Sequence, residues 1–447
     1  MSFFVRQSKY RHVFCEPAAP QNTYTALRIS TVTGEHNYIK GNTKFFAVSL
    51  QGGGGPVAVI PYTAYGRYDQ NPPVISGHRG NVLDFEFNPF HEQIIATGSE
   101  DLTIKVWGIP EAGLTETIRD PLVDMHGHGK KVTLLRFHPA ANNILASVAA
   151  DYTVKIWDIE KGAEITSVQA PHSNLIHDIV WDYLGKSYFT SCKDKTVRCF
   201  DARSSEVTME IPNAHEGMKS TKMANLGDSG RLATLGFTRQ SGRQLKIWDC
   251  RNMGAELKTL EIDRAPGVMM PFYDPDSQLL FIAGKGDGNI RYFETVEESP
   301  FVYAINEFRT NNAAKGMGMV PKMGLNVSKN ETARLLKMTS STVEPLSFIV
   351  PRKSDAFQED LFPETACGIP ALSADEWVAG EDRPPVKGSL NPDLAGGNGP
   401  RQAAAATQQA FKPTRPAAEI QKELDAALAR IEKLEAQLRE AGLEPAT

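Results

Sequence analysis

The chain has 447 residues, a net charge of −5 and 41% hydrophobic residues, which excludes a single small domain and gives no sign of a bulk nucleic-acid binder. Its five cysteines are odd in number and none forms a C-x-x-C pair, so we expect neither a disulfide framework nor a zinc site. The first residues lack the apolar core of a signal peptide and no long apolar run follows, so we expect a cytoplasmic protein.

Residues 1–75 contain strand-like runs at Thr25–Thr31, Lys44–Leu50 and Val57–Tyr62, which we interpret as a divergent first blade of a repeat protein. A strand near Tyr10 to Phe14 is expected to pair with the last blade, because closing a ring removes two exposed sheet edges. Arg28 alternates with Leu27 and Ile29, so its side chain should leave the core. The pattern leaves two interpretations open for Arg28, a solvated side chain or a contact for an acidic partner.

Residues 76–295 contain five related units, each with a short strand that ends in an aromatic residue. The anchors are 50, 43, 48 and 45 residues apart and are Trp107, Trp157, Phe200, Trp248 and Phe293. A period in the forties with a Trp-Asp dipeptide is typical of a β-propeller blade. Further strand-like runs at Arg334–Met338 and Leu346–Val350 predict a last divergent blade. We therefore predict an all-β, seven-bladed WD-repeat propeller over residues 1–350.

A histidine series runs in phase with the aromatic anchors, at His78, His128, His172 and His215. In WD-repeat blades such a His, a hydroxyl, an Asp and a Trp can form a buried hydrogen-bonded network, and Ser147 and Ser191 lie where the hydroxyl is expected. The alternative is metal or acid–base chemistry, but no single active site needs a repeated set. The predicted structural network comprises His78, Asp101, Trp107, His128, Ser147, Asp151, Trp157, Asp194, Trp248 and Asp287.

Three segments follow the propeller. Residues 351–380 carry Phe357, Phe362 and Trp377, which predicts an extension packed on the propeller. Residues 381–416 are rich in Pro, Gly and Ala, a composition typical of a flexible linker. Residues 417–443 have a heptad pattern, with Leu424, Ile431 and Leu438 at a and Ile420, Ala427, Leu434 and Ala441 at d, which predicts a short α-helical coiled coil.

The coiled coil has two possible uses, oligomerisation or docking onto its own propeller. The 3.5-residue period and the preceding linker favour oligomerisation. The segment from Arg430 to Glu435 resembles a short trimerisation motif of parallel coiled coils, so a parallel trimer is predicted, while Ala at two d positions would permit other states. The predicted oligomerisation residues are Ile420, Leu424, Ala427, Arg430, Ile431, Leu434, Glu435 and Leu438.

Several motifs in chain order resemble the coronin family of actin-binding WD-repeat proteins. They are Val5–Phe14, Gly98–Leu114, Cys192–Arg198, Met270–Asp276, Ala283–Phe293 and Val350–Asp355. The resemblance implies binding to filamentous actin, regulation of the branch-nucleating actin-related-protein complex and of cofilin-driven turnover, and a place in the cytoplasmic actin cytoskeleton at the cell cortex. It matches Arg28 to the family's actin-contacting arginine, and Ser2 to a regulatory phosphorylation position.

Arg6 and Lys9 are further candidates for actin contact, and cofilin and acidic phospholipids are further candidate partners. The sequence has no nucleophile elbow, H-E-x-x-H or acidic metal loop, so no catalytic residue, metal or cofactor is predicted, and no nucleic-acid partner. The alternative function is a general WD-repeat adaptor for membrane-traffic or signalling complexes.

Overall fold

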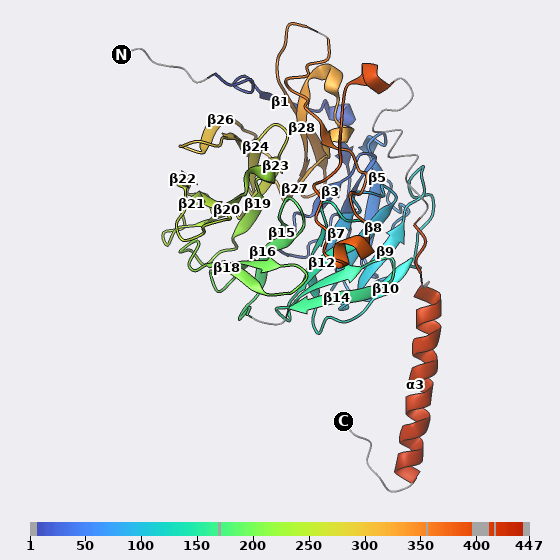
Figure 1. The fold of residues 1–447 in the computed structure, drawn as a ribbon. Coiled ribbons are helices and arrows are strands. Elements are labelled where there is room, and N and C mark those ends of the chain that lie inside the picture. Colours follow the sequence, from blue (N-terminus) through green and yellow to red (C-terminus); the bar gives the residue numbers. More distant parts are fainter. Residues whose placement is uncertain (1–6, 169–170, 355, 396–410, 415–416, 441–447) are drawn as a thin grey trace.

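The computed structural model describes residues 7–168, 171–354, 356–395, 411–414 and 417–440 of the chain. Its body is a ring of β-sheets arranged as the blades of a propeller, with one long helix projecting from the rim (Figure 1). Blades 2 to 6 are four-stranded antiparallel sheets of consecutive strands, blade 1 has three strands, and blade 7 gathers strands from distant parts of the chain. The predicted all-β, seven-bladed fold is confirmed.

The strands of the first four blades are short and follow one another along the chain. Blade 1 consists of β3 (Ile39–Gly41), β4 (Phe45–Ser49) and β5 (Val57–Pro61). Blade 2 consists of β7 (Val82–Phe87), β8 (Ile94–Ser99), β9 (Ile104–Gly108) and β10 (Val123–Met125). Blade 3 consists of β11 (Val132–Phe137), β12 (Ile144–Ala149), β13 (Val154–Asp158) and β14 (Ala163–Val168). Blade 4 consists of β15 (Ile176–Trp181), β16 (Ser187–Cys192), β17 (Val197–Asp201) and β18 (Val207–Ile211).

The last three blades complete the ring. Blade 5 consists of β19 (Lys222–Asn225), β20 (Arg231–Phe237), β21 (Arg243–Asp249) and β22 (Lys258–Asp263). Blade 6 consists of β23 (Met269–Asp274), β24 (Leu279–Gly284), β25 (Ile290–Thr295) and β26 (Val302–Phe308). Blade 7 combines β27 (Gly316–Met319), β28 (Glu331–Met338) and β29 (Val343–Ile349) with β1 (Phe14–Pro17), β2 (Tyr24–Thr25) and β6 (Gly66–Arg67).

The aromatic anchors of the repeat pack between blades. Trp107 of blade 2 belongs to a buried cluster with residues of blade 1, and Trp157 of blade 3 belongs to one with residues of blade 2. Both side chains are at most 2% exposed. Burying an aromatic side chain stabilises by about 1.5–3 kcal/mol, so each anchor helps to hold its blade against the preceding one.

The order of the strands gives the ring two distinct ends. The first strands contact one another around the central channel, and the consecutive strands of blades 2 to 6 are antiparallel, as are β3 to β5 and β27 to β29. The turns between second and third strands and the blade-to-blade connections therefore share one end, which we call the upper face. The lower face carries the other turns, which join first to second strands and third to fourth strands.

The ring closes as expected, through pairing of the N-terminal strand with the last blade. β1 runs antiparallel to β29 from Phe14↔Ile349 to Pro17↔Leu346, slightly later in the chain than predicted. The predicted strand Thr25–Thr31 is wrong. Ala26 has φ 63°, which interrupts an extended strand, so Tyr24–Thr25 joins blade 7 and β3 becomes the first strand of blade 1.

The extension after residue 350 runs across the lower face. Leu361 and Phe362 enter the core of blades 6 and 7, and the Thr365 hydroxyl donates to Asp276 at 2.6 Å. Trp377, on α1 (Ala374–Val378), is fully buried between blades 3 and 4, where its indole N–H donates to the Gly185 carbonyl at 3.2 Å. The predicted extension therefore packs on the propeller.

The linker begins later than the predicted residue 381. β30 (Thr365–Ala366) pairs with β31 (Lys387–Gly388), and Lys387 lies 3.5 Å from Asp276, so the packed segment continues beyond residue 381. Much of the predicted linker, residues 396–410 and 415–416, lies outside the described residues. Short 3-10 helices occur at Pro20–Asn22, Gly227–Ser229, Lys322–Gly324, Val327–Lys329 and Pro392–Ala395.

The long helix α3 spans Ala417–Glu440, within the predicted coiled-coil segment. In the described part of the chain, no helix combines the length and apolar character needed to cross a bilayer.

Candidate interaction surfaces

The predicted structural residues of blades 2 and 3 meet in hydrogen-bonded clusters. His78 Nδ1 lies 2.9 Å from Asp101 Oδ2, and its Nε2 lies 2.7 Å from the Thr97 hydroxyl. That hydroxyl also accepts the indole N–H of Trp107 at 2.8 Å. Burial would raise the pKa of Asp101, but hydrogen bonds from His78 and Thr103 lower it below its usual range. The cluster ties the strands of the blade together.

Blade 3 repeats the arrangement with Ser147 as the hydroxyl. Ser147 Oγ lies 2.7 Å from His128 Nε2 and accepts the Trp157 indole N–H at 2.8 Å. Asp151 lies 3.5 Å from His128 Nδ1. Buried polar groups that are mutually paired in this way are tolerated in a core, and their repetition fits a structural role.

Blade 4 departs from the prediction. Ser191 points to the other side of its strand and donates to the Thr221 carbonyl at 2.7 Å, so its assignment as the network hydroxyl is wrong. Thr190 takes that position, 2.8 Å from His172 Nε2, while Asp194 pairs with Arg198 at 2.8 Å. The spacing of the sequence could have identified Thr190, because the hydroxyl residue lies ten positions before the aromatic anchor in blades 2, 3 and 4.

Blades 5 and 6 use other partners. The Trp248 indole N–H donates to Thr234 at 2.9 Å, and Thr234 lies 2.9 Å from His215 Nε2. Asp287 accepts from the buried guanidinium of Arg243 in the neighbouring blade, at 2.8 Å. Asp287 thus takes part in a blade-to-blade ion pair rather than in a His network.

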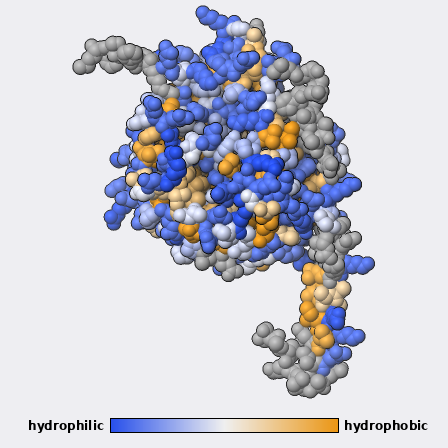
Figure 2. Space-filling view, in the orientation of Figure 1, coloured by the Kyte–Doolittle hydropathy of each residue, from blue (hydrophilic) through white to orange (hydrophobic). Residues whose placement is uncertain are grey.

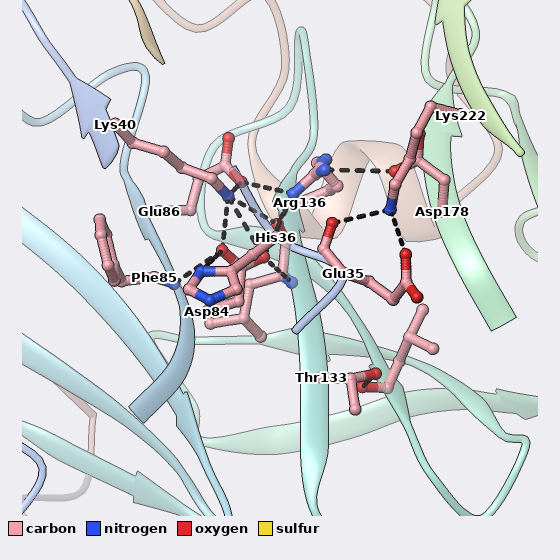
Figure 3. Close-up of polar contacts among 12 residues, drawn as sticks. Glu35, His36, Lys40, Asp84, Phe85, Glu86, Thr133, Arg136, Asp178 and Lys222 are labelled. Carbon is pink, nitrogen blue, oxygen red and sulfur yellow. Dashed lines mark hydrogen bonds and ion pairs between the residues drawn. The ribbon is translucent and has the colours of Figure 1, made fainter. Parts of the chain in front are cut away.

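A second polar network, which the sequence did not predict, lines the central channel (Figure 3). Lys40 lies 2.7 Å from Glu86 and 3.1 Å from Asp84, and Arg136 lies 3.3 Å from both Asp84 and Asp178. Burial would raise the pKa of Asp84, but the neighbouring cations lower it overall. These side chains come from the first strands of successive blades.

The same network joins the blades through the backbone. Asp84 of blade 2 accepts the Leu135 N–H of blade 3 at 2.9 Å, and Asp178 of blade 4 accepts the Met223 N–H of blade 5 at 2.9 Å. The two cations and three carboxylates of the network are paired with one another, and in the described residues no group of His, Cys, Asp or Glu is placed to hold a metal ion. We therefore assign it to the cohesion of the ring rather than to chemistry.

The segment before β3 reaches over the channel mouth on the upper face. Glu35 lies 2.9 Å from Lys222, and Lys285 donates to the carbonyls of Gly34 and His36 at 2.9 and 2.8 Å. Burial opposes ionisation of Glu35, yet Lys222 and His177 lower its pKa to about 2. Lys285 is itself desolvated, and burial together with Lys222 lowers its pKa to about 7.

Arg28 lies on the upper face between blades 7 and 1. Its carbonyl accepts the Gln51 N–H at 2.8 Å, and the N–H of Leu27 donates to the Ser341 carbonyl at 3.0 Å. Leu27 and Ile29 are buried and Arg28 is exposed, as the alternation predicted. Among the described residues, the Arg28 guanidinium has no hydrogen-bond or ion-pair partner.

The upper face around Arg28 carries many exposed cations. Its turns and blade-to-blade connections expose Arg79, Lys130, Lys131, Lys193, Lys219, Arg239, Arg264 and Arg309, whereas Asp69 and Glu216 are the exposed acids of these segments in the part of the chain described. The lower face mixes exposed acids such as Glu111 and Glu160 with exposed cations such as Lys186. A face of this charge suits an acidic partner.

Lys9 does not join Arg28 in one patch. Its ammonium donates to the Asp360 carbonyl of the extension at 2.5 Å, close to Tyr10 in the core of blades 6 and 7. Lys9 therefore lies toward the lower face, which separates it from Arg28. Arg6 and Ser2 lie outside the described residues.

Helix α3 presents apolar side chains to solvent. Leu424, Ile431 and Leu434 are 43%, 50% and 50% exposed, and Figure 2 shows apolar side chains along one side of the projecting helix. Ala427 and Arg430 are also exposed. The side chains of Ile420, Glu435 and Leu438 and residues 441–443 lie outside the description. Among the described residues, no other segment covers the stripe, so the chain leaves it unpartnered.

The segment just before α3 is attached to the propeller rim. Phe411, like Leu122, packs against the core between blades 2 and 3, and its ring centroid lies 6.4 Å from that of His91. The Thr414 N–H donates to the Glu160 carbonyl at 2.9 Å. Residues 411–414 are thus attached to the lower rim.

Comparisons with known proteins agree with this fold. A model of a domain of unknown function (DUF1899) matches residues 3–67, one described as a type of WD40 repeat matches residues 343–385, and that of the WD domain, G-beta repeat, matches residues 71–108 and 119–158. Coronin-A of Dictyostelium discoideum is 46% identical over 391 residues, which cover 87% of each chain. The chain belongs to the coronin family.

Solved structures extend the comparison. The crystal structure of the WD40 domain from Toxoplasma gondii coronin matches with a TM-score of 0.80 and 30% identity, covering 86% of this chain and 98% of that one. A chain in a crystal structure of the Mitotic Checkpoint Complex matches with a TM-score of 0.56 and 15% identity, over 79% of this chain and 98% of its own, and so shares the fold alone. The coronin resemblance inferred from the sequence motifs is confirmed.

Proposed function

We propose that this coronin is a non-catalytic scaffold that binds actin filaments through its upper face and regulates their turnover. Membership of the coronin family supports the partner, and the site rests on one observation: Arg28 is exposed on a basic face and is unpaired among the described residues. The actin filament is acidic, so a face with an excess of exposed cations suits it. We further propose that the protein acts in the cytoplasm at the actin-rich cortex, with the branch-nucleating actin-related-protein complex, cofilin and acidic phospholipids as further partners.

Arg28→Asp tests the filament site. A charge-assisted hydrogen bond contributes about 1.5–3 kcal/mol, so its loss should weaken co-sedimentation with filaments by about tenfold or more. Lys329→Asp is the matched control. Lys329 is also exposed, and its substitution makes the same change of charge on the lower face of blade 7. If Arg28→Asp and Lys329→Asp bind filaments as tightly as the unaltered protein, Arg28 is not part of the site.

We also propose that α3 joins several propellers, as a parallel trimer. Its exposed stripe on Leu424, Ile431 and Leu434 supports this, since a 24-residue helix of about 36 Å with an uncovered apolar stripe is marginal alone. When several weakly binding propellers of one oligomer bind the same filament, their apparent affinity rises by about 10²–10⁴-fold where geometry permits.

Ile431→Lys tests the assembly. A lysine at a central a position should yield monomers by multi-angle light scattering and weaken filament binding by about tenfold or more. Ala429→Lys, at an outward f position of the same helix, should leave the oligomeric state and filament binding unchanged. A monomeric unaltered protein would refute the trimer while leaving the Arg28 proposal standing.

A further inference from the structure

The mouth of the central channel holds a hollow of about 310 Å³ on the upper face, above blades 2 to 4. Leu83 and Ile176 form part of its lining and are only 4% and 3% exposed. Leu175 at its edge exposes 38% of its surface although it is apolar, and Lys131 lines the hollow with an exposed ammonium. The hollow is therefore lined by apolar side chains together with Thr33, Thr133 and Glu35, and it is positively charged at the rim.

The rim is held in place by the turns beside it. The Ala150 N–H donates to the Lys131 carbonyl at 2.9 Å, and the Lys193 N–H donates to the Leu175 carbonyl at 2.8 Å. Two residues after Ala150, Tyr152 has φ 70°, a left-handed conformation that costs a bulky residue about 1–2 kcal/mol. Its ring lies 5.7 Å from the Lys130 ammonium. Because the rim is already ordered, binding of a ligand costs little additional conformational entropy.

The residues that line the hollow do not neutralise the positive charge of its rim. Glu35 is the acid among the described residues that line it. Its carboxylate points to Lys222, 2.9 Å away, as Figure 3 shows, and also accepts from the Ser220 hydroxyl at 2.8 Å. Lys130, Lys131 and Lys193 are exposed and, among the described residues, their ammonium groups have no acidic partner. Unpaired cations around an apolar hollow suit a ligand that combines carboxylates with one apolar group.

We propose that this hollow binds a short acidic peptide segment of a partner protein. One apolar side chain of the peptide rests on Leu83, Leu175 and Ile176, and flanking carboxylates pair with Lys130, Lys131 and Lys193. A concave site with an apolar lining favours a peptide over a lipid surface, which would meet the basic groups without entering the hollow. The site lies above blades 2 to 4, apart from Arg28 between blades 7 and 1, although its lysines belong to the same basic upper face.

Fluorescence anisotropy with the full chain and a fluorescein-labelled peptide of Asp and Glu around one central Phe tests the proposal. Lys131→Glu and Leu175→Asp should each weaken peptide binding by about tenfold, a loss of about 1.4 kcal/mol. Lys186→Glu makes the same charge change in an exposed turn on the lower face of blade 4, and Arg28→Asp reverses charge elsewhere on the upper face. Neither control should weaken binding, and circular dichroism checks that all variants are folded.

The composition of the probe separates the outcomes. Replacing the central Phe of the peptide by Ala should weaken binding several-fold, because the hollow then loses its apolar ligand. Absence of peptide binding, or binding unaffected by both Lys131→Glu and Leu175→Asp, would overturn the proposal. So would binding of phosphatidylserine vesicles that depends on Lys131 when the peptide does not bind, since the surface would then face a membrane.

Discussion

Replacing Thr97 with Val tests how the blade networks contribute to stability. Thr97 is fully buried, accepts the Trp107 indole N–H at 2.8 Å and lies 2.7 Å from His78 Nε2. Valine keeps the shape of the side chain and removes the hydroxyl, so two buried polar groups lose their partner. Each such loss costs about 1–3 kcal/mol, so the free energy of unfolding should fall by about 2–6 kcal/mol.

Thr190→Val is the matched comparison, because blade 4 offers the same buried hydroxyl with one partner fewer. Thr190 lies 2.8 Å from His172 Nε2, and Phe200, which has no N–H, takes the place of the tryptophan. The same substitution should therefore cost only about 1–3 kcal/mol, half the loss expected for Thr97→Val. Thr234→Val in blade 5, where Trp248 and His215 both contact the hydroxyl, should resemble Thr97→Val.

Equilibrium urea unfolding followed by circular dichroism measures these differences as shifts of the midpoint at a common slope. A Trp107→Phe background adds a second check, because Thr97→Val should then cost about as much as Thr190→Val. The loss in free energy of unfolding is expected to depend on how many buried polar groups are left without a hydrogen-bond partner. Equal losses for Thr97→Val and Thr190→Val, or a larger loss for Thr190→Val, would refute this expectation.

Two further predictions concern the lower face. Burial lowers the pKa of His138 to about 3, although its hydrogen bond to the Gly185 carbonyl opposes the shift. The unfolded value is about 6.5, so the unfolded chain binds more protons between pH 6.5 and about 3, and this stability is present above pH 6.5 and declines as the pH falls. The melting temperature of the unaltered protein should therefore drop more between pH 7 and 5 than that of His138→Gln, and parallel curves would contradict this. Trp377→Ala should remove about 3–5 kcal/mol of packing and expose the extension to limited proteolysis, whereas intact protection would show that other contacts hold it.

The candidate sites were only partly predictable from the sequence. Arg28 is exposed because strict alternation sets which side of the chain faces the core, and alternation can be read locally. Lys9 is near Arg28 in the sequence but lies toward the other face, since the chain between them pairs along β29 from one end of the ring toward the other. The ion network of Lys40, Asp84 and Arg136 carries no local pattern, because its members come from first strands of different blades.

The sequence alone determined the features that repeat at short range. The spacing of aromatics and histidines specifies the blades, and the heptad pattern specifies α3, because strand alternation and helical periodicity are properties of neighbouring residues. Only the tertiary structure decided which residues meet across the ring. It placed Thr190 rather than Ser191 beside His172, seated Trp377 between blades 3 and 4, and set a basic rim around an apolar hollow at the channel mouth. These contacts join residues far apart in the chain, and ring closure, not local pattern, brings them together.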